Sequence, residues 1–368
     1  MPGVNQPAVR RLIERARRDI DDGTLPSCQL ALAVNGEIAL FETFGSATGQ
    51  TPYLTLSSVK PLLSMLVLAL AEEGRLQLEM PVRHYLPEFA ANGKEHVTVE
   101  QVMLHTCGFP RARIPDELAS TSAGRRRAFA GWHLSYPPGT RFDYHPESAH
   151  WVLAELVEAV TGADFRSALH ARVTDPLGLP NVLNGTRVNA PLVACGQEAT
   201  AAELRAAFGV SRGERPAVTV DGVLHFDDPT FKSLASPGGG GVMTAAELAT
   251  FYCEILTGRH SLWAESTLAL ARSDVRNELP DSTLGCRTRR TVAFVVAGPD
   301  GHASLRGFGR AGSPRAFGHN GAKGQIAWAD PDFGLAFVYF TNGMDRNVVR
   351  DPRRTTALSS LASACATT

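Results

Sequence analysis

The sequence predicts an α+β fold in which the two ends of the chain build one antiparallel sheet, flanked by helices, with a mainly helical lobe inserted between them. Strand patterns occur near the N-terminus and return near the C-terminus, at 29–34, 37–44, 291–297, 324–330 and 333–340. Helices and loops dominate the sequence between these two groups. We therefore expect a sheet lobe from residues 1–60 and 201–368, a helical lobe from residues 61–200, and a functional site between them.

The first elements follow from the spacing of apolar residues and from turn signals. Apolar side chains recur at helical intervals over 8–21, with arginines between them, which predicts a surface helix. Asn35-Gly36 separates the first two strands and is a two-residue signal for a β-hairpin. A long apolar run then predicts a buried helix over 55–73, in which Pro61 is tolerated because it lies near the first turn, and Gly74 ends the helix.

Further helices, a turn and a loop complete the pattern. The remaining helical patterns lie at 96–105, 148–161, 164–173, 201–208, 244–256 and 355–365. Arginines 125–127 fit an exposed loop or a short helix, and Pro331-Asp332 predicts a tight turn between the last two strands. The four glycines at 238–241 lack the Gly-Lys-Ser/Thr continuation of a phosphate-binding loop, so we expect a flexible loop beside the site.

The composition is that of an ordinary globular protein without a strong charge. Hydrophobic residues make up 44% of the chain and charged residues 20%, and the formal net charge is -1. This balance gives no overall attraction to nucleic acid or to an anionic membrane. Basic clusters at Arg10-Arg11, Arg17-Arg18, 125–127 and 287–290 have no interleaved aromatic residues and are interpreted as solvated faces. We expect no nucleic-acid partner, and the oligomeric state stays open.

Neither a membrane location nor a metal site is indicated. The N-terminus enters a charged helix without the apolar core of a signal peptide, and the longest apolar run, 61–71, is too short to span a bilayer. We therefore expect a cytoplasmic protein without a membrane partner. The six cysteines are scattered without a CxxC pair, and the eleven histidines lack metal-ligand spacing. The sequence thus predicts reduced, mostly buried cysteines, no metal and no cofactor.

One motif places a hydroxyl and an amine on the same face of the helix that begins near residue 55. Ser57-Ser58-Val59-Lys60 is an S-x-x-K tetrad, and residues three apart are neighbours on a helix. A serine hydroxyl is a weak nucleophile unless an adjacent base takes its proton, and burial favours the neutral amine that can do so. Of the four lysines in the chain, only Lys60 has a serine or threonine three residues before it. A helix-start serine beside a solvated lysine is the alternative interpretation of the tetrad alone.

Several further segments occur in a recognisable order after this tetrad. They are Glu73 to Leu78, Val102-Met103-Leu104-His105-Thr106-Cys107-Gly108, Pro138 to Tyr144, Gly239 to Thr244, and Gly318-His319-Asn320-Gly321-Ala322. In this order they resemble the boxes of the serine β-lactamase and penicillin-binding-protein family, in the branch of class C β-lactamases, family VIII esterases and D-aminopeptidases. The likeness covers most of the chain and implies the β-lactamase/transpeptidase-like fold.

The resemblance implies a role for each matching residue. Ser57 would be the acylated nucleophile and Lys60 the base that takes its proton. Tyr144 would work with Lys60 and pass a proton to the leaving group. The backbone N–H groups of Ser57 and Ala322 would form the oxyanion hole. His319, Asn320 and Gly321 match a substrate-binding box on a strand, and His105 is expected to be structural.

Two positions depart from the family pattern. The Tyr-x-Asn box is here Tyr144-His145-Pro146, so the side-chain amide of the asparagine is missing. His319 stands where penicillin-recognising members often carry lysine, and a histidine is only partly charged near pH 7. Both departures, with the missing export signal, argue against a true β-lactamase or a cell-wall DD-peptidase. His145, His150 and Trp328 either line the pocket or are simply packed.

The sequence therefore predicts a serine acyl-enzyme catalyst that acts on a small-molecule ester or amide through acyl-Ser57. Water as the acceptor would make it an esterase-like intracellular hydrolase. An amine or alcohol acceptor would make it an acyltransferase of natural-product biosynthesis, and pocket shape and water access decide between the two. A catalytically silent binding protein of the same fold is the rival from another class, supported by the missing asparagine and opposed by the presence of Ser57, Lys60 and Tyr144 together.

Overall fold

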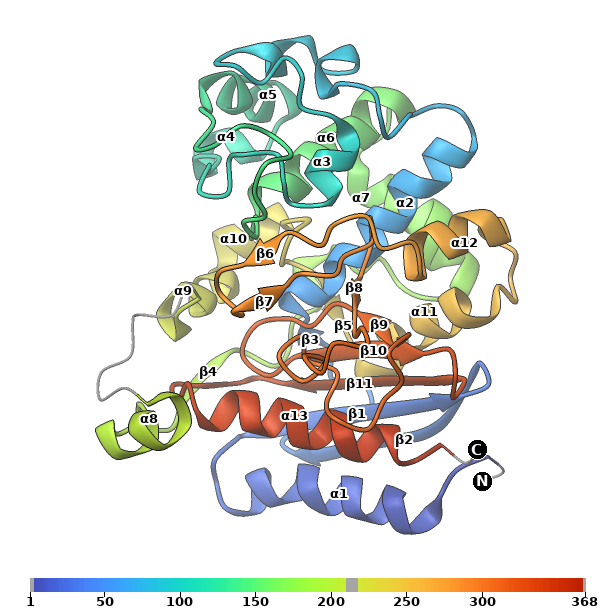
Figure 1. Cartoon of the computed structure of the whole chain (residues 1–368), viewed down its shortest axis with the longest axis vertical. Coiled ribbons are helices and arrows are strands. Elements are labelled where there is room, and N and C mark those ends of the chain that lie inside the picture. Colours follow the sequence, from blue (N-terminus) through green and yellow to red (C-terminus); the bar gives the residue numbers. More distant parts are fainter. Residues whose placement is uncertain (1–2, 210–217, 367–368) are drawn as a thin grey trace.

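The computed structural model describes residues 3–209 and 218–366, and a six-stranded antiparallel sheet forms the base of this part of the chain (Figure 1). The strand order is β2-β1-β11-β10-β9-β8. The strands are β1 Ser27–Val34, β2 Glu37–Gly45, β8 Val295–Val296, β9 Phe317–Gly318, β10 Ile326–Asp330 and β11 Leu335–Thr341. Because β1 pairs with β11 from Cys28↔Thr341 to Val34↔Leu335, both chain ends build the sheet, as the sequence predicts.

The hairpin between β1 and β2 turns where the sequence predicts. Asn35 and Gly36 have φ angles of 51° and 82°, and two positive φ values suit the primed turn that matches strand twist. All eight residues of β1 are buried, whereas β2 lies at the sheet edge and is mostly exposed or half-buried. The hairpin thus places β1 in the interior of the sheet.

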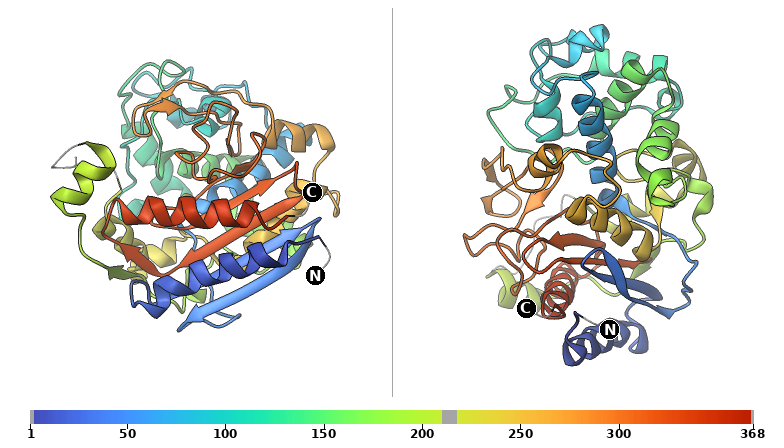
Figure 2. Two further views of the ribbon diagram at one scale, coloured as in Figure 1. Left: turned by 60° about the horizontal axis from the view of Figure 1, so that its bottom comes forward. Right: turned by 90° about the vertical axis from the view of Figure 1, so that its right-hand side faces the viewer.

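Helices cover both faces of the sheet (Figure 2). Side chains alternate along β1, so Ala31 and Ala33 join one core cluster, whereas Leu30 and Leu32 join the other. α11, Ala245–Thr257, packs on the alanine face, while α1, Gln6–Asp21, and α13, Arg350–Ser363, lie side by side on the leucine face. The small alanines leave room for α11, which separates the sheet from the site-bearing helix α2.

A second group of helices lies at the opposite end of the molecule from α1 (Figure 1). It contains α3 Val99–Met103, α4 Asp116–Ala119, α5 Ser122–Gly131, α6 Ser148–Thr161 and α7 Phe165–Leu169. α2, Lys60–Glu72, runs between this group and the sheet, and ten of its residues are buried. A helix that is apolar on all sides is stable only inside a core. α2 therefore lies in the core between the sheet and this group of helices.

The remaining elements are short. They are β3 Tyr53–Leu54 with β5 Val242–Met243, β4 Val193–Cys195 with β12 Gly343–Asp345, β6 Pro280–Asp281 with β7 Cys286–Arg287, and helices α8 Ala201–Phe208, α9 Val220–Leu224, α10 Pro229–Leu234 and α12 Glu265–Arg272. β4 falls in the segment 61–200 assigned to the helical lobe, yet it pairs with β12 near the C-terminus. Within the described ranges, no helix has both the length and the apolarity to cross a membrane.

The predicted and observed boundaries of the helices agree best where a residue next to the helix in the sequence caps it. The predicted helices at 148–161 and 201–208 coincide with α6 and α8, each ended by a left-handed glycine. The helix predicted at 96–105 shrinks to α3, because Thr98 and Gln101 form a capping box and His105 has a φ of 57°. The strand predicted at 291–297 shortens to the two residues of β8.

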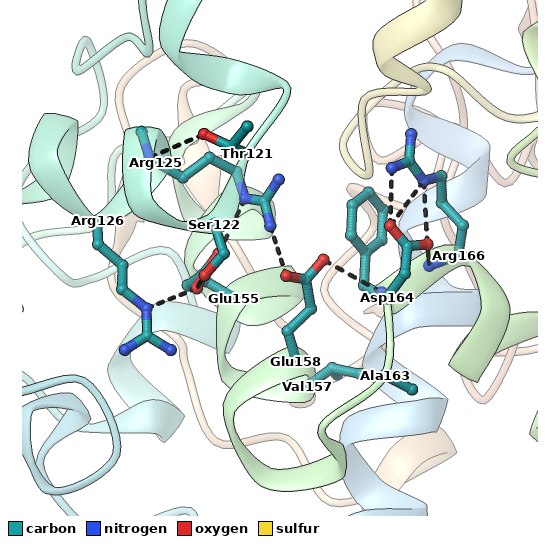
Figure 3. Close-up of polar contacts among 12 residues, drawn as sticks. Thr121, Ser122, Arg125, Arg126, Glu155, Val157, Glu158, Ala163, Asp164 and Arg166 are labelled. Atoms are coloured by element: carbon teal, nitrogen blue, oxygen red, sulfur yellow. Dashed lines mark hydrogen bonds and ion pairs between the residues drawn. The ribbon is translucent and has the colours of Figure 1, made fainter.

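The expectation for arginines 125–127 was wrong at Arg125, which is buried in α5 (Figure 3). Its Nε lies 2.9 Å from Glu155 Oε2, and its Nη2 lies 2.6 Å from Glu158 Oε2. Arg126 holds the other oxygen of Glu155 at 2.7 Å. A buried guanidinium requires such partners, so the network fixes α5 against α6.

Replacing Glu155 with alanine is expected to lower the free energy of unfolding by about 3 kcal/mol, because Arg125 would stay buried with one carboxylate fewer. Urea denaturation monitored by circular dichroism measures this loss. Asp332→Ala is the matched control, since its partner Arg315 has a side chain that is 64% exposed and the pair should add little. Equal stability of Glu155→Ala and the parent protein would contradict the assignment of this network as a structural anchor.

Candidate active site

Ser57 lies in a 3₁₀ turn, Leu56–Val59, that leads directly into α2. Leu56, just before it, has a φ of 49°, a left-handed conformation that costs a non-glycine residue about 1–2 kcal/mol. Thr55 N–H donates to Gly241 O at 2.8 Å and fixes the start of the turn. Ser58 and Val59 are buried, whereas Ser57 is only half-buried. The strained turn therefore presents the Ser57 hydroxyl at the surface of an otherwise buried segment.

Lys60 is the first residue of α2 and is 1% exposed. Its Nζ lies 3.2 Å from Ser57 Oγ and 2.6 Å from Pro146 O, and it also donates to Gly238 O. An ammonium can donate to all three oxygens. A neutral amine can give its two N–H groups to the carbonyls and direct its lone pair at Ser57 Oγ. The site thus accommodates both protonation states, as a general base requires.

Tyr144 lies beside this pair. Its ring centroid is 5.5 Å from Lys60 Nζ, and its hydroxyl is buried without a hydrogen-bond partner among the described residues. The ring also packs against His105, with centroids 4.8 Å apart. His105 Nδ1 accepts from the backbone of His145, so His105 supports the loop that carries Tyr144. The structure therefore brings Ser57, Lys60 and Tyr144 together.

The segment 320–322 approaches the nucleophile from the sheet. A Cβ on Gly321 would lie 2.5 Å from Thr55 O, so only glycine allows this approach. Within the described part of the chain, no hydrogen bond uses the N–H of Ser57 or of Ala322. Both groups are therefore unoccupied, and their role as an oxyanion hole, which the family resemblance implies, stays a prediction. Asn320, by contrast, uses its side chain to hold Ala327 N and Gly307 O, which makes it a structural residue.

His319 faces the site as a neutral imidazole. Its ring centroid lies 6.0 Å from that of Tyr144, and its Nε2 is buried with no described partner. Burial, with the positive charges of Arg290 and Lys60, lowers the pKa of His319 well below its ordinary value. His319 therefore offers a hydrogen bond but no positive charge at neutral pH.

Two predicted pocket residues do not line the site. His145 is fully buried, its Nε2 accepts from Phe109 N at 3.1 Å, and its Nδ1 lies 2.6 Å from Asp143 O. Trp328 faces α13, where its Nε1 donates to Ser359 Oγ. Of the two alternatives for His145 and Trp328, the structure favours simple packing over lining the pocket, because internal hydrogen bonds already satisfy both side chains.

The glycines 238–241 form a tightly packed loop rather than a flexible one. An added Cβ would lie 2.8 Å from Glu147 Oε1 at Gly238, 2.3 Å from Phe226 at Gly239, and 2.6 Å from Val59 at Gly241. Real Cβ atoms do not approach this closely, so the loop can pack only because it lacks side chains. Its function here is to hold Gly238 O against Lys60.

Sequence reasoning missed Glu147 and Ser236, which join the two backbone segments that hold Lys60. Ser236 Oγ donates to Glu147 Oε2 and accepts from Gly238 N at 3.3 Å. Pro146 O and Gly238 O, the two acceptors of Lys60, belong to these same segments. Burial raises the pKa of Glu147, although the Lys60 charge opposes this shift. In the sequence, the one signal that could have pointed to Glu147 is its position directly after Pro146, the residue that departs from the Tyr-x-Asn pattern.

Sequence reasoning also missed Arg290, because it is the last residue of the basic cluster 287–290, which was interpreted as a solvated face. Arg287 is exposed as expected, whereas Arg290 is buried with its guanidinium carbon 5.8 Å from the ring centroid of Tyr144. A positive charge thus stands next to the site at a position outside every recognised box.

Comparison with known proteins identifies the family of the chain. The chain matches the Beta-lactamase family over residues 9–362. It is 26% identical over 343 residues to the esterase/beta-lactamase LipL of Mycobacterium tuberculosis, covering 85% of this chain and 76% of LipL. Its fold resembles that of a family VIII carboxylesterase, with a TM-score of 0.75, 24% identity and coverage of 98% and 99%. It also resembles EstCE1, a hydrolase with promiscuous acyltransferase activity, with a TM-score of 0.72, 18% identity and coverage of 96% and 99%. From its β-lactamase/transpeptidase-like fold and this match across its length, the chain belongs to the Beta-lactamase family.

Proposed function

We propose that the protein is an esterase-like hydrolase that cleaves a small-molecule ester or activated amide through an acyl-Ser57 intermediate. The observation that carries this proposal is the coordination of Lys60, whose two carbonyl partners leave a lone pair directed at Ser57 Oγ in the neutral state. Nucleophilic catalysis by serine needs such an adjacent base.

The reaction has two balanced halves. Ser57 Oγ attacks the substrate carbonyl carbon as its proton passes to Lys60, and the N–H groups of Ser57 and Ala322 bind the oxyanion. The intermediate collapses, and the leaving oxygen or nitrogen takes a proton through Tyr144 and Lys60. Water then attacks acyl-Ser57 and loses a proton to Lys60, which releases the acid and restores the serine hydroxyl.

Acyl transfer is the second candidate function. An amine or alcohol in place of water would accept the acyl group through the same steps, and the resemblance to EstCE1, named for promiscuous acyltransferase activity, favours testing it. Pro146 and His319 argue against a true β-lactamase or DD-peptidase. Pro146 replaces the asparagine of the family pattern, and His319 replaces the lysine. The assembled site also argues against a silent binding protein.

Mass spectrometry of the intact wild-type protein tests the proposal. After mixing with a p-nitrophenyl ester, we expect nitrophenol release and a mass increase equal to one acyl group, located on the peptide that contains Ser57. Added amines or alcohols that yield amide or ester products would assign the protein to the acyltransferases. Absence of both adduct and nitrophenol over a panel of short and medium acyl chains would argue for the silent binding protein.

A further inference from the structure

Arg290 differs from the other buried arginines of the described chain. Arg125, Arg306 and Arg354 each bind a carboxylate: Arg125 binds Glu155 at 2.9 Å, Arg306 binds Asp300 at 2.6 Å, and Arg354 binds Asp345 at 2.8 Å. Arg290 is 6% exposed, yet no described carboxylate lies within ion-pairing distance of it, and its Nε has no hydrogen-bond partner there. A buried charge without a partner is costly, so a ligand is expected to supply one.

The backbone around Arg290 holds the guanidinium in place. Arg290 N donates to Asn277 O at 2.9 Å, and Arg290 O accepts from Asn277 N at 3.0 Å. Asn277 in turn donates from its side chain to Leu104 O at 3.0 Å, next to His105. The guanidinium carbon lies 5.9 Å from the ring centroid of Phe142 and 5.8 Å from that of Tyr144. Arg290 is therefore fixed against the wall of the active site.

The side chains that this guanidinium shares with the site are polar and unsatisfied, and the nearby carboxylate of Asp281 lies beyond ion-pairing distance. Tyr144 Oη, His319 Nε2 and both ring nitrogens of His150 are buried with no described partner. Burial lowers the pKa of His150 and of His319, so both rings are neutral at neutral pH. The ammonium form of Lys60 would add a second positive charge. A guanidinium among such groups attracts an anion, and the unsatisfied polar atoms offer it hydrogen bonds.

We propose that Arg290 binds a carboxylate on the half of the substrate that leaves from acyl-Ser57, or on the acceptor that takes its place. The assignment to this half follows from Tyr144, which protonates the leaving group and lies next to Arg290. Esters of hydroxy acids or amides of amino acids are the corresponding substrate class. This inference rests on the proposed function. It assigns to Arg290 the electrostatic attraction for a substrate carboxylate, which the neutral His319 does not provide.

A matched pair of aryl esters tests the inference. 3-Acetoxybenzoate and 3-acetoxybenzamide form the same acetyl-Ser57 and differ only in the charge on the leaving phenol. We expect wild-type kcat/KM to favour the carboxylate by about tenfold or more, as a charged hydrogen bond typically contributes. Arg290→Gln should bring this ratio to about one, through a larger loss of kcat/KM with the carboxylate than with the benzamide. Arg287→Gln, which changes an exposed arginine of the same cluster, should keep the wild-type preference.

Other outcomes overturn the inference in distinguishable ways. An equal loss with both esters in Arg290→Gln would mean that Arg290 acts through Tyr144 or the fold, and equal use of both esters by the wild type would exclude a carboxylate subsite. Inhibition of the wild type by 3-hydroxybenzoate but not by 3-hydroxybenzamide supports the subsite without any variant, and equal inhibition opposes it. No acetyl-Ser57 from either ester would overturn the proposed function itself, and the inference with it.

Discussion

Ser57→Ala is expected to lower kcat/KM for a p-nitrophenyl ester by at least about 10⁴-fold, because loss of a nucleophile removes the covalent route entirely. The substitution deletes one half-buried hydroxyl whose described contact is with Lys60, so the fold should persist. Initial rates and the thermal unfolding midpoint, measured on the same preparation, separate loss of chemistry from loss of structure. The mass increase of the wild type should also disappear.

Ser58 provides the matched control for this substitution. It is the next residue of the same 3₁₀ turn, it is fully buried, and its hydroxyl has no described hydrogen-bond partner. Ser58→Ala removes the same atom type from the same turn and should retain most of the activity. If Ser58→Ala abolished turnover while Ser57→Ala kept it, the nucleophile would be assigned to the wrong serine.

The features predicted correctly are those that the sequence encodes locally. Asn35-Gly36 specifies its own turn, Gly162 ends α6, and the S-x-x-K spacing alone brings Ser57 and Lys60 together. The order of the boxes then placed Tyr144 in the site. The turn, the cap and the S-x-x-K spacing act over a few residues, so they do not depend on how distant segments pack, whereas Tyr144 was placed by the family resemblance.

The failures concern contacts between distant segments. Alternation along β10 predicts that Trp328 shares a face with Ile326, but not that this face packs against α13 rather than the site. Arg290 reaches Tyr144 from a segment nearly 150 residues away, so a basic cluster in the sequence gave no hint of its burial. Ser236 contacts Glu147 from 89 residues away, which is why the support of Lys60 was not foreseen.

Lys60→Met is expected to reduce kcat/KM by about 10³-fold, the range attributed to a positioned general base. Methionine retains much of the side-chain volume but cannot take the Ser57 proton, and it leaves Pro146 O and Gly238 O without a donor. The loss should appear in the rate of acyl-Ser57 formation, measured by rapid mixing with a p-nitrophenyl ester, while bound ester remains detectable by competition. An unchanged acylation rate would exclude Lys60 as the base.

A second buried lysine allows the effect of the base to be separated from the effect of burial. Lys94 is fully buried and donates to two backbone carbonyls, Ala91 O and Trp132 O, much as Lys60 does, and burial lowers its pKa to about 8. Lys94→Met removes the same kind of amine from the same kind of cage, but no serine hydroxyl is bonded to it. We expect Lys94→Met to destabilise the fold and keep the acylation rate. A difference in acylation rate between the two variants then reports the contact with Ser57 Oγ, which Lys60 makes and Lys94 does not.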